Sequence, residues 1–366
     1  MRYCEGSVHV VQHMGPGGIE TLVLDLLASG STHDRVFSLE GNTEDLAEAW
    51  TLLPPLGSRF EAFGKRPGKD LGLVFRLRKR LAALRPAAVF VHHIGPLIYG
   101  GTAARLARCP KLVHVEHDVW QYEKGGSGHS AMRRRTIAAL FFRALRPEHI
   151  AVSATTAETV ARISGSSEVR VIAPGVRLDR FRPADEGIIR KLLGLNSTIK
   201  VIGSVGRLSE EKGHLFLIRS ISSCANNVHL VLVGDGPMRP VLEAEVRQLG
   251  LGQRVHFMGH RDDVEALMPG FDIFCLPSLN EGLPRTLLEA QACGVPVVAS
   301  DTGGVREAVC PATGLMVQPG NPETLRAAFL EVLSRDHAGD PRAFIAAKFS
   351  FEKTLTSFNE FSVPTK

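Results

Sequence analysis

The chain has 366 residues, which is too long for one compact core and predicts two domains of ordinary size. A hydrophobic content of 44% and a charged content of 22% are typical of a globular protein and exclude a disordered or fibrous chain. The net charge of +5 hides an uneven distribution, because residues 58–146 carry 18 Lys and Arg against 5 Asp and Glu.

The six cysteines are scattered without a C-x-x-C pair, which predicts buried, reduced thiols. The first residues lack the apolar segment of a signal peptide. The sequence also has no run of 18 apolar residues, so it predicts no transmembrane helix. We therefore expect a cytoplasmic protein.

The basic excess of the first half predicts a surface that attracts anionic lipid headgroups or phosphate-bearing acceptors, although ordinary solvated helix faces explain it equally well. Arg133, Arg134 and Arg135 precede the apolar run IAALFF, which predicts either a helix at the inner face of a membrane or a helix of the core. The absence of interleaved aromatic residues argues against a nucleic-acid partner.

Short apolar runs alternate with helix-like segments along the whole chain, a pattern typical of parallel sheets covered on both faces. The sequence therefore predicts an α/β fold of two doubly wound domains. The predicted strands lie at 8–13, 88–93, 111–117 and 149–153, and then at 200–206, 229–234, 254–259, 272–278 and 295–300. Glycines and prolines at 171–187 mark the break, and 349–361 has the pattern of an amphipathic helix. We expect domains at 1–176 and 177–348, with 349–366 packing back toward the first.

Two features of the first half are candidates for a site. Gly17 and Gly18 lie in a loop between a strand and a helix, where glycine lets the backbone approach a phosphate or an acceptor closely, although the loop is not the G-x-G-x-x-G fingerprint. His117 ends the predicted strand of VHVEHDVW, where a histidine is more often structural than functional. The tandem His92 and His93 predict only a strand end and a turn.

The segment GSVGRLSEEKGH at 203–214 places Arg207 and Lys212 in a loop that follows a strand. Two cations in such a loop can neutralise a diphosphate. Alternatively, both pair with Glu210 and Glu211 in a solvated loop.

The strongest pattern is PSLNEGLPRTLLEAQACGVPVVAS at 277–300. Pro284 lies where a helix should begin, and the N-terminus of that helix would direct free N–H groups at an anion. Glu281 in the loop and Glu289 on the helix are separated by the spacing E-x7-E, and carboxylates are strong acceptors for sugar hydroxyls.

The E-x7-E spacing, together with EGLPRTLLEA, GVPVVASDTGGVREAV and TGLMVQPGNPETL, resembles the family-four retaining glycosyltransferases of the GT-B fold. The resemblance implies two Rossmann-like domains that face each other across a cleft. The sequence departs from the family's pattern in the linker at 172–177, where IAPGVR stands in place of I-P-N-G-V-D.

What the resemblance implies for the donor half is a nucleoside-diphosphate sugar held without a metal or cofactor. Glu281 would contact the sugar and Glu289 the ribose hydroxyls, with Arg207 and Lys212 on the diphosphate. Backbone amides of Leu283 and Arg285 would surround the sugar and phosphates, and Arg261 would lie near the base.

The resemblance also gives roles to the first half. His117 would lie near the reacting carbon and the acceptor hydroxyl, and Gly17 and Gly18 would face the donor. The expected acceptor is a saccharide or a lipid-linked saccharide. A sugar-nucleotide epimerase of the same fold and a non-catalytic interaction protein are the alternatives; the second would have damaged donor residues, whereas Arg207, Lys212 and both glutamates are intact.

Overall fold

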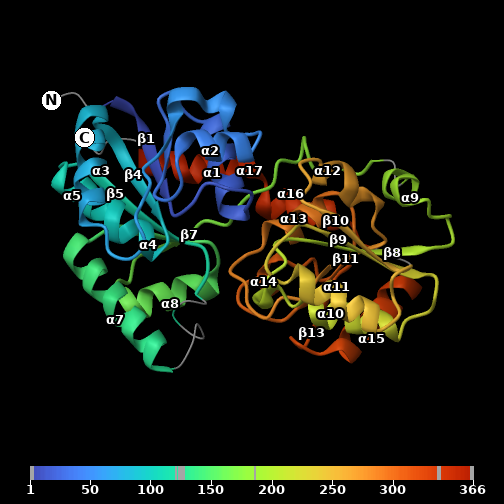
Figure 1. Cartoon of the computed structure of the whole chain (residues 1–366). Coiled ribbons are helices and arrows are strands. Elements are labelled where there is room, and N and C mark those ends of the chain that lie inside the picture. The colour runs from blue at the N-terminus through green and yellow to red at the C-terminus, as the bar shows by residue number, and fades with distance from the viewer. Residues whose placement is uncertain (1–3, 120–121, 123–127, 185–186, 336–338, 363–366) are drawn as a thin grey trace. The chain divides into compact units, whose positions relative to one another are not determined.

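The computed structural model describes residues 4–119, 122, 128–184, 187–335 and 339–362. It divides into two compact units (Figure 1). The first comprises Met1–Ala173 and Glu352–Lys366, and the second comprises Pro174–Phe351.

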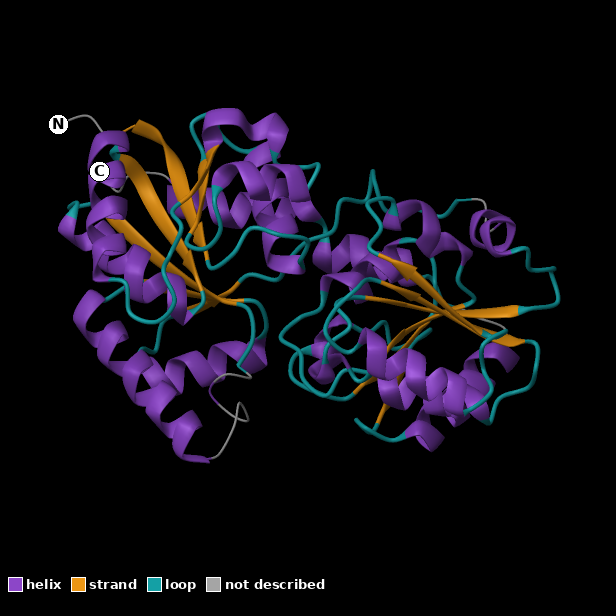
Figure 2. Cartoon of the chain, viewed as in Figure 1, coloured by secondary structure: helices purple, strands orange, loops and turns teal. Residues whose placement is uncertain are grey.

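The first unit is built on a seven-stranded parallel sheet with the strand order β3-β2-β1-β4-β5-β6-β7. Helices cover both faces of this sheet (Figure 2). The strands are β1 (Cys4–Val11), β2 (Arg35–Ser38), β3 (Phe60–Ala62), β4 (Pro86–His92), β5 (Lys111–Glu116), β6 (Glu148–Ala151) and β7 (Val169–Val171). The helices are α1 (Gly18–Ser29), α2 (Thr43–Ala49), α3 (Leu71–Leu84), α4 (Ile94–Pro96), α5 (Thr102–Leu106), α7 (Gly128–Leu145), α8 (Ala154–Ser164) and α17 (Phe351–Ser362).

Alternation along the central strands divides the core of this unit between the two faces. Val8 and Val10 of β1 pack with α3, α5 and α7, whereas Val11 packs with α1 and α2. The short polar side chains Asp70 and Ser153 cap α3 and α8 by accepting hydrogen bonds from backbone N–H groups, which explains where these helices begin.

The second unit is built on a six-stranded parallel sheet with the order β10-β9-β8-β11-β12-β13. Its strands are β8 (Lys200–Val205), β9 (Val228–Val233), β10 (Val255–Gly259), β11 (Ile273–Leu276), β12 (Val297–Ser300) and β13 (Leu315–Val317). Its helices are α9 (Gly187–Leu193), α10 (His214–Ser222), α11 (Arg239–Gln248), α12 (Val264–Leu267), α13 (Arg285–Ala292), α14 (Val305–Ala308), α15 (Pro322–Ser334) and α16 (Pro341–Phe349).

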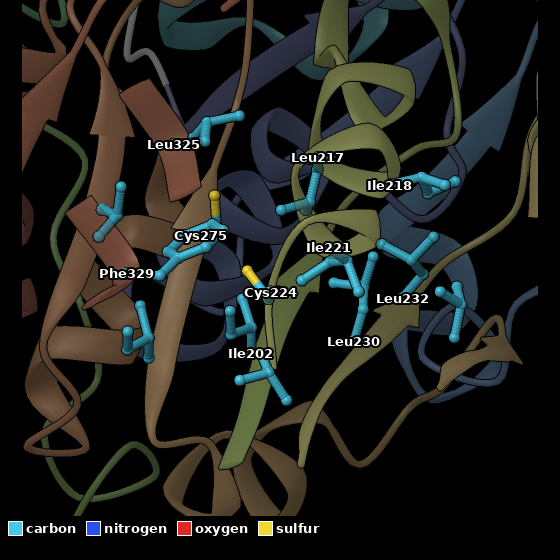
Figure 3. Packing of buried hydrophobic residues seen from close by; sticks show 14 of the residues in the cluster. Ile202, Leu217, Ile218, Ile221, Cys224, Leu230, Leu232, Cys275, Leu325 and Phe329 are labelled. Atoms are coloured by element: carbon cyan, nitrogen blue, oxygen red, sulfur yellow. The ribbon is translucent and has the colours of Figure 1, made fainter. Parts of the chain in front are cut away.

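An apolar cluster of the second unit lies between this sheet and the helices α10, α11 and α15 (Figure 3). Ile202 and Leu230 from the strands meet Leu217 and Ile221 of α10, and Phe329 of α15 is buried in the same cluster. Burying each such side chain stabilises the fold by roughly 1.5–3 kcal/mol relative to leaving it in water.

The last helix returns to the first unit. Thr354 of α17 donates a side-chain hydrogen bond of 2.9 Å to the carbonyl of Ala173. The ring of Phe358 lies 5.5 Å from that of Phe90 in β4 and is 3% exposed. Helix α17 is therefore a structural part of the first unit.

The structure confirms the predicted α/β fold with two parallel sheets and every strand predicted from an apolar run, with ends shifted by a few residues. Strands β2, β3, β7 and β13, of three or four residues each, were not predicted. Cys109, Cys224, Cys275, Cys293 and Cys310 are free and buried, as predicted. No helix in the described residues is long and apolar enough to cross a bilayer.

Candidate functional site

The carboxyl ends of β8 and β11 define a topological switch point in the second sheet. The two strands are parallel neighbours, but the chain leaves β8 toward β9 on one side and leaves β11 toward β12 on the other. Ligands of open α/β sheets bind in the crevice that such a divergence creates. The loops at 206–213 and 277–284 follow these two strands and carry Arg207, Lys212, Glu281 and Leu283 of the predicted donor residues.

An ion pair joins the two loops across the switch point. Lys212 Nζ lies 2.6 Å from Glu281 Oε1, and the Ser278 hydroxyl donates a hydrogen bond of 2.8 Å to the same oxygen. Glu281 is only 9% exposed, whereas the side chain of Lys212 is 28% exposed. Two donors thus hold a buried carboxylate in one position, and the cation remains accessible to a ligand.

Glycines allow the loops around this pair to approach each other closely. Gly213 has φ +67° and Gly303 has φ +51°, both in the left-handed region. A Cβ at Gly213 would collide with the carbonyl oxygen of Pro277, and one at Gly303 would collide with that of Glu281. Only glycine therefore fits at either position without moving the backbone that carries Glu281.

Helix α13 begins next to this pair. Its first residue is Arg285 and Pro284 is the N-cap, so the helix starts one residue later than the sequence predicts. Arg285 and Glu289 lie one turn apart and are 6% and 7% exposed, with Arg285 Nε 3.6 Å from Glu289 Oε1. The free N–H groups and the positive end of the helix dipole therefore lie in the same loop region as Glu281.

The other predicted donor residues have different surroundings. Arg207 is exposed in the loop after β8, and Leu283 is buried just before α13. Arg261 follows β10, which is separated from β8 by β9, and its guanidinium makes two hydrogen bonds to Asp263, of 2.8 and 2.6 Å. The structure thus joins Lys212 to Glu281 and places Arg261 farther along the same sheet edge.

A second switch point lies between β1 and β4 of the first sheet. Gly17 is the exposed N-cap of α1 and Gly18 is its first residue. The carboxylate of Glu20 turns back to occupy the space where a side chain at Gly17 would lie. Burial raises the pKa of Glu20 to about 7, against smaller opposing effects from a backbone hydrogen bond and the charge of His93.

His117 directly follows β5 and is half-buried. Its Nε2 lies 2.8 Å from Nδ1 of His92, the last residue of β4. Burial, together with neighbouring positive charge, holds the pKa values of both histidines well below their usual range. His117 is therefore neutral at physiological pH in the absence of a ligand.

A buried carboxylate lies next to His117 in the chain. Glu116 is fully buried, forms an ion pair with Nδ1 of His93 and accepts a hydrogen bond of 2.8 Å from the Tyr122 hydroxyl. Burial opposes protonation of His93, but the carboxylates of Glu116, Asp118 and Glu20 together outweigh burial and raise the pKa of His93 to about 9. His93 also has φ +71°, a strained value for a residue with a side chain.

Sequence reasoning predicted the strand end at His92 but missed the chemistry of this cluster. A signal was present, since Glu116 directly follows the run LVHV of a predicted strand, and a carboxylate buried at such a position needs partners. The partners themselves could not be identified without the order of the strands.

Two family models together match most of the chain. The model described as Glycosyltransferase Family 4 matches residues 16–180, and the one described as Glycosyl transferases group 1 matches residues 185–348. EpsF of Bacillus subtilis (strain 168), which is named as a glycosyltransferase, is 30% identical over 327 residues, covering 85% of this chain and 82% of EpsF. The chain belongs to this family of glycosyltransferases.

One further relative in sequence and one solved structure are also similar to this glycosyltransferase. The UDP-Gal:α-D-GlcNAc-diphosphoundecaprenol α-1,3-galactosyltransferase of Escherichia coli is 29% identical over 64% of this chain and 63% of its own. Anabaena Alr3699/HepE, solved with UDP and glucose, has a TM-score of 0.84 at 24% identity and covers 97% of this chain and 98% of its own, which shows the shared fold.

In the part of the chain that the structure describes, no group of three or more His, Cys, Asp or Glu is arranged to hold a metal ion.

Proposed function

We propose that this glycosyltransferase moves a sugar from a nucleoside-diphosphate sugar to an acceptor hydroxyl with retention of anomeric configuration. The observation that carries the proposal is the Lys212–Glu281 pair at the switch point of the second sheet, next to the start of α13. The relatives support a nucleotide-sugar donor, because HepE was solved with UDP and with UDP-glucose and the E. coli enzyme is named for UDP-Gal.

The donor's diphosphate carries two negative charges and gains more negative charge as its bond to the sugar breaks. Lys212, Arg207 and the N–H groups at the start of α13, which include those of Leu283 and Arg285, supply the opposite charge without a metal. Glu281 is already oriented by Ser278, so it can accept hydrogen bonds from sugar hydroxyls when Lys212 turns to the phosphates. Glu289 holds the ribose, and Arg261 lies toward the base.

In the first unit, we assign His117 to the acceptor hydroxyl and Gly17 and Gly18 to the close approach of the donor. The attack comes from the face of the leaving group, so no nucleophile from the protein is needed. Two relatives are named for a diphosphoundecaprenol-linked and a phosphatidylinositol-linked saccharide, which supports a lipid-linked saccharide acceptor and a role in polysaccharide or glycolipid synthesis. Other relatives are named for D-inositol 3-phosphate.

Helix α7 supports a peripheral association with an anionic membrane at its cytoplasmic face. Phe142 of α7 packs in the core, whereas Met132 and Leu140 are 62% and 63% exposed on the same side of the helix as the exposed Arg133 and Arg143. An apolar and basic face of this kind matches the surface of an anionic bilayer.

Sedimentation with vesicles of anionic and of neutral lipid tests this association. We expect binding to anionic vesicles that weakens with salt, and a loss of binding in the variant Met132→Ser/Leu140→Ser. The variant Leu330→Ser, which changes a residue of α15 that is 46% exposed, is the control. Wild-type protein that stays in the supernatant at low salt would remove the membrane from the proposal.

The function itself is tested with the full chain and a panel of nucleotide sugars. A true donor should raise the melting temperature, and transfer to a lipid-linked saccharide should then be measured with that donor. We expect Glu281→Ala to abolish transfer while the circular dichroism spectrum stays unchanged, and Glu331→Ala, which changes an exposed glutamate of α15, to leave transfer intact.

Product analysis separates this function from the alternatives. Release of an epimerised nucleotide sugar without a glycoside would make the protein an epimerase. Wild-type turnover in the Glu281→Ala variant would remove Glu281 from the mechanism.

A further inference from the structure

Three histidines form a continuous row on one face of the first sheet. His9 lies in β1, His92 ends β4 and His117 follows β5, and these strands are neighbours in the order β1-β4-β5. His9 Nδ1 lies 3.1 Å from His92 Nε2, and His92 Nδ1 lies 2.8 Å from His117 Nε2. Consecutive rings are stacked, with centroids 5.4 and 5.1 Å apart.

The row runs from the core of the first unit to the candidate site. His9 is 4% exposed and His92 is 1% exposed, whereas His117 is half-buried. The ring of His9 stacks on Phe90 at 4.7 Å and lies 6.4 Å from Phe358 of α17. Polar rings in such apolar surroundings cost stability unless their nitrogens are paired, and the row pairs one nitrogen of His9, both of His92 and one of His117.

Pairing of neutral rings couples their tautomers. A neutral imidazole carries a proton on only one nitrogen, so each link in the row needs one donor and one acceptor. Two proton arrangements satisfy both links. In one, His117 Nε2–H donates to His92 and His92 Nε2–H donates to His9, which leaves His117 Nδ1 as an acceptor. In the other, both bonds are reversed and His117 Nδ1 carries a proton.

We propose that His92, supported by His9, is a positioning residue that fixes the ring and the tautomer of His117. The arrangement with Nδ1 as an acceptor is the productive one, because this nitrogen can then receive a hydrogen bond from an acceptor hydroxyl. The proposal rests on the role assigned above to His117. It adds that the row behind His117 couples the tautomer of His117 to those of His92 and His9, and so affects which ring nitrogen the substrate meets.

Two substitutions of His92 separate this role from packing. His92→Leu fills the site with an apolar side chain and removes the bond to His117. His92→Asn places an amide near the former Nδ1 and can restore that bond, although not the one to His9. The matched control is His229→Leu, because His229 and His256 form an equally stacked pair in the second unit, with nitrogens 3.1 Å apart and centroids 5.3 Å apart.

The experiment combines nitrogen-15 NMR of the histidine rings in the full chain with transfer kinetics. We expect one neutral tautomer of His117 in the wild type and a mixture in His92→Leu, whereas the amide of His92→Asn can restore the hydrogen bond to His117 Nε2. The kcat of His92→Leu should fall about tenfold or more, with the KM for the donor unchanged. His92→Asn should recover most of this loss, and His229→Leu should match the wild type.

A His117 tautomer and a kcat that are the same in His92→Leu and in the wild type would overturn the proposal. Equal losses in His92→Leu and His92→Asn would also overturn it, because that outcome indicates packing alone. If the wild type transfers no sugar, the proposed function fails, and the tautomer of His117 in the two variants still decides whether the row fixes it.

Discussion

The position of Glu281 depends on Gly303, a residue that has no side chain with which to contact a substrate. Gly303 follows β12 and lies against the carbonyl oxygen of Glu281. Its φ of +51° and this close approach are two separate reasons why the position requires glycine. Gly165, the C-cap of α8, shares only the first reason, since its φ is +70° but nothing lies within 4 Å of where a Cβ would be.

This difference predicts the effect of Gly303→Ala. We expect Gly165→Ala to lower the free energy of unfolding by about 1 kcal/mol, which is the cost of a left-handed backbone with a side chain. Gly303→Ala should cost roughly 3 kcal/mol or more, because the backbone next to Glu281 must also move. Urea unfolding measures both, and a thermal shift with the donor should show that only Gly303→Ala loses the ligand. Equal costs for the two variants would contradict this account of the loop.

The proximity of the Lys212 and Glu281 side chains could be predicted from the sequence, because loops that follow neighbouring parallel strands lie at one edge of the sheet. The row of His9, His92 and His117 could not. Its members are 25 to 108 positions apart in the sequence, and only the strand order and register place them on one face.

Helix α17 shows how an element at the far end of the chain completes the core of the first unit. Its amphipathic pattern predicted a helix, but the pattern does not say which surface it covers. In the structure Phe358 packs against the rings of Phe90 and His9. The short strands β2, β3, β7 and β13 were missed for a related reason, since they are specified by pairing with neighbours rather than by their own sequence.

Phe358→Ala tests the contribution of α17. We expect a loss of roughly 3–5 kcal/mol, because a buried phenylalanine is replaced by a cavity. The loss should be confined to the first unit, so hydrogen exchange should rise in β1 and β4 and stay unchanged in β8 and β11. Phe75→Ala removes a ring that is 64% exposed and should change stability by less than about 0.5 kcal/mol. Faster exchange in β8 after Phe358→Ala would show that the two units do not respond separately.

For the whole molecule, the buried histidines make the free energy of unfolding depend on pH. Burial lowers the pKa of His9 and of His214 to about 4, and that of His149 to about 3. In the unfolded chain these histidines take up a proton near pH 6.5, whereas in the folded chain they stay neutral at that pH. Their contribution to the free energy of unfolding is therefore complete above pH 6.5 and is lost as the pH falls toward their folded pKa values.

Two other groups stabilise the folded protein at low pH and lose this effect as the pH rises. The pKa of His93 is raised to about 9 and that of Glu20 to about 7, so both favour the folded state at low pH. The contribution of Glu20 is lost as the pH rises from 4.5 to about 7, and that of His93 as it rises from 6.5 to about 9. Stability should therefore be greatest near neutral pH and should fall on both sides.

Urea unfolding between pH 4.5 and 9 measures this dependence. We expect His9→Phe to flatten the acid side of the curve, because the unfolded state then has one proton fewer to take up. An unchanged acid slope in His9→Phe would contradict the assignment.

The division of the first unit into two separate pieces of sequence has a consequence for synthesis. The ribosome delivers residues 4–173 before the second unit, whereas residues 352–362, which close the core of the first unit, follow the second unit in the chain. The second unit is continuous from 174 to 351, so it can fold before the segment that completes the first unit has been synthesised. During that interval the apolar surface around Phe90 is open to chaperones, and a premature stop near codon 351 would yield a product with one finished half and one unfinished half.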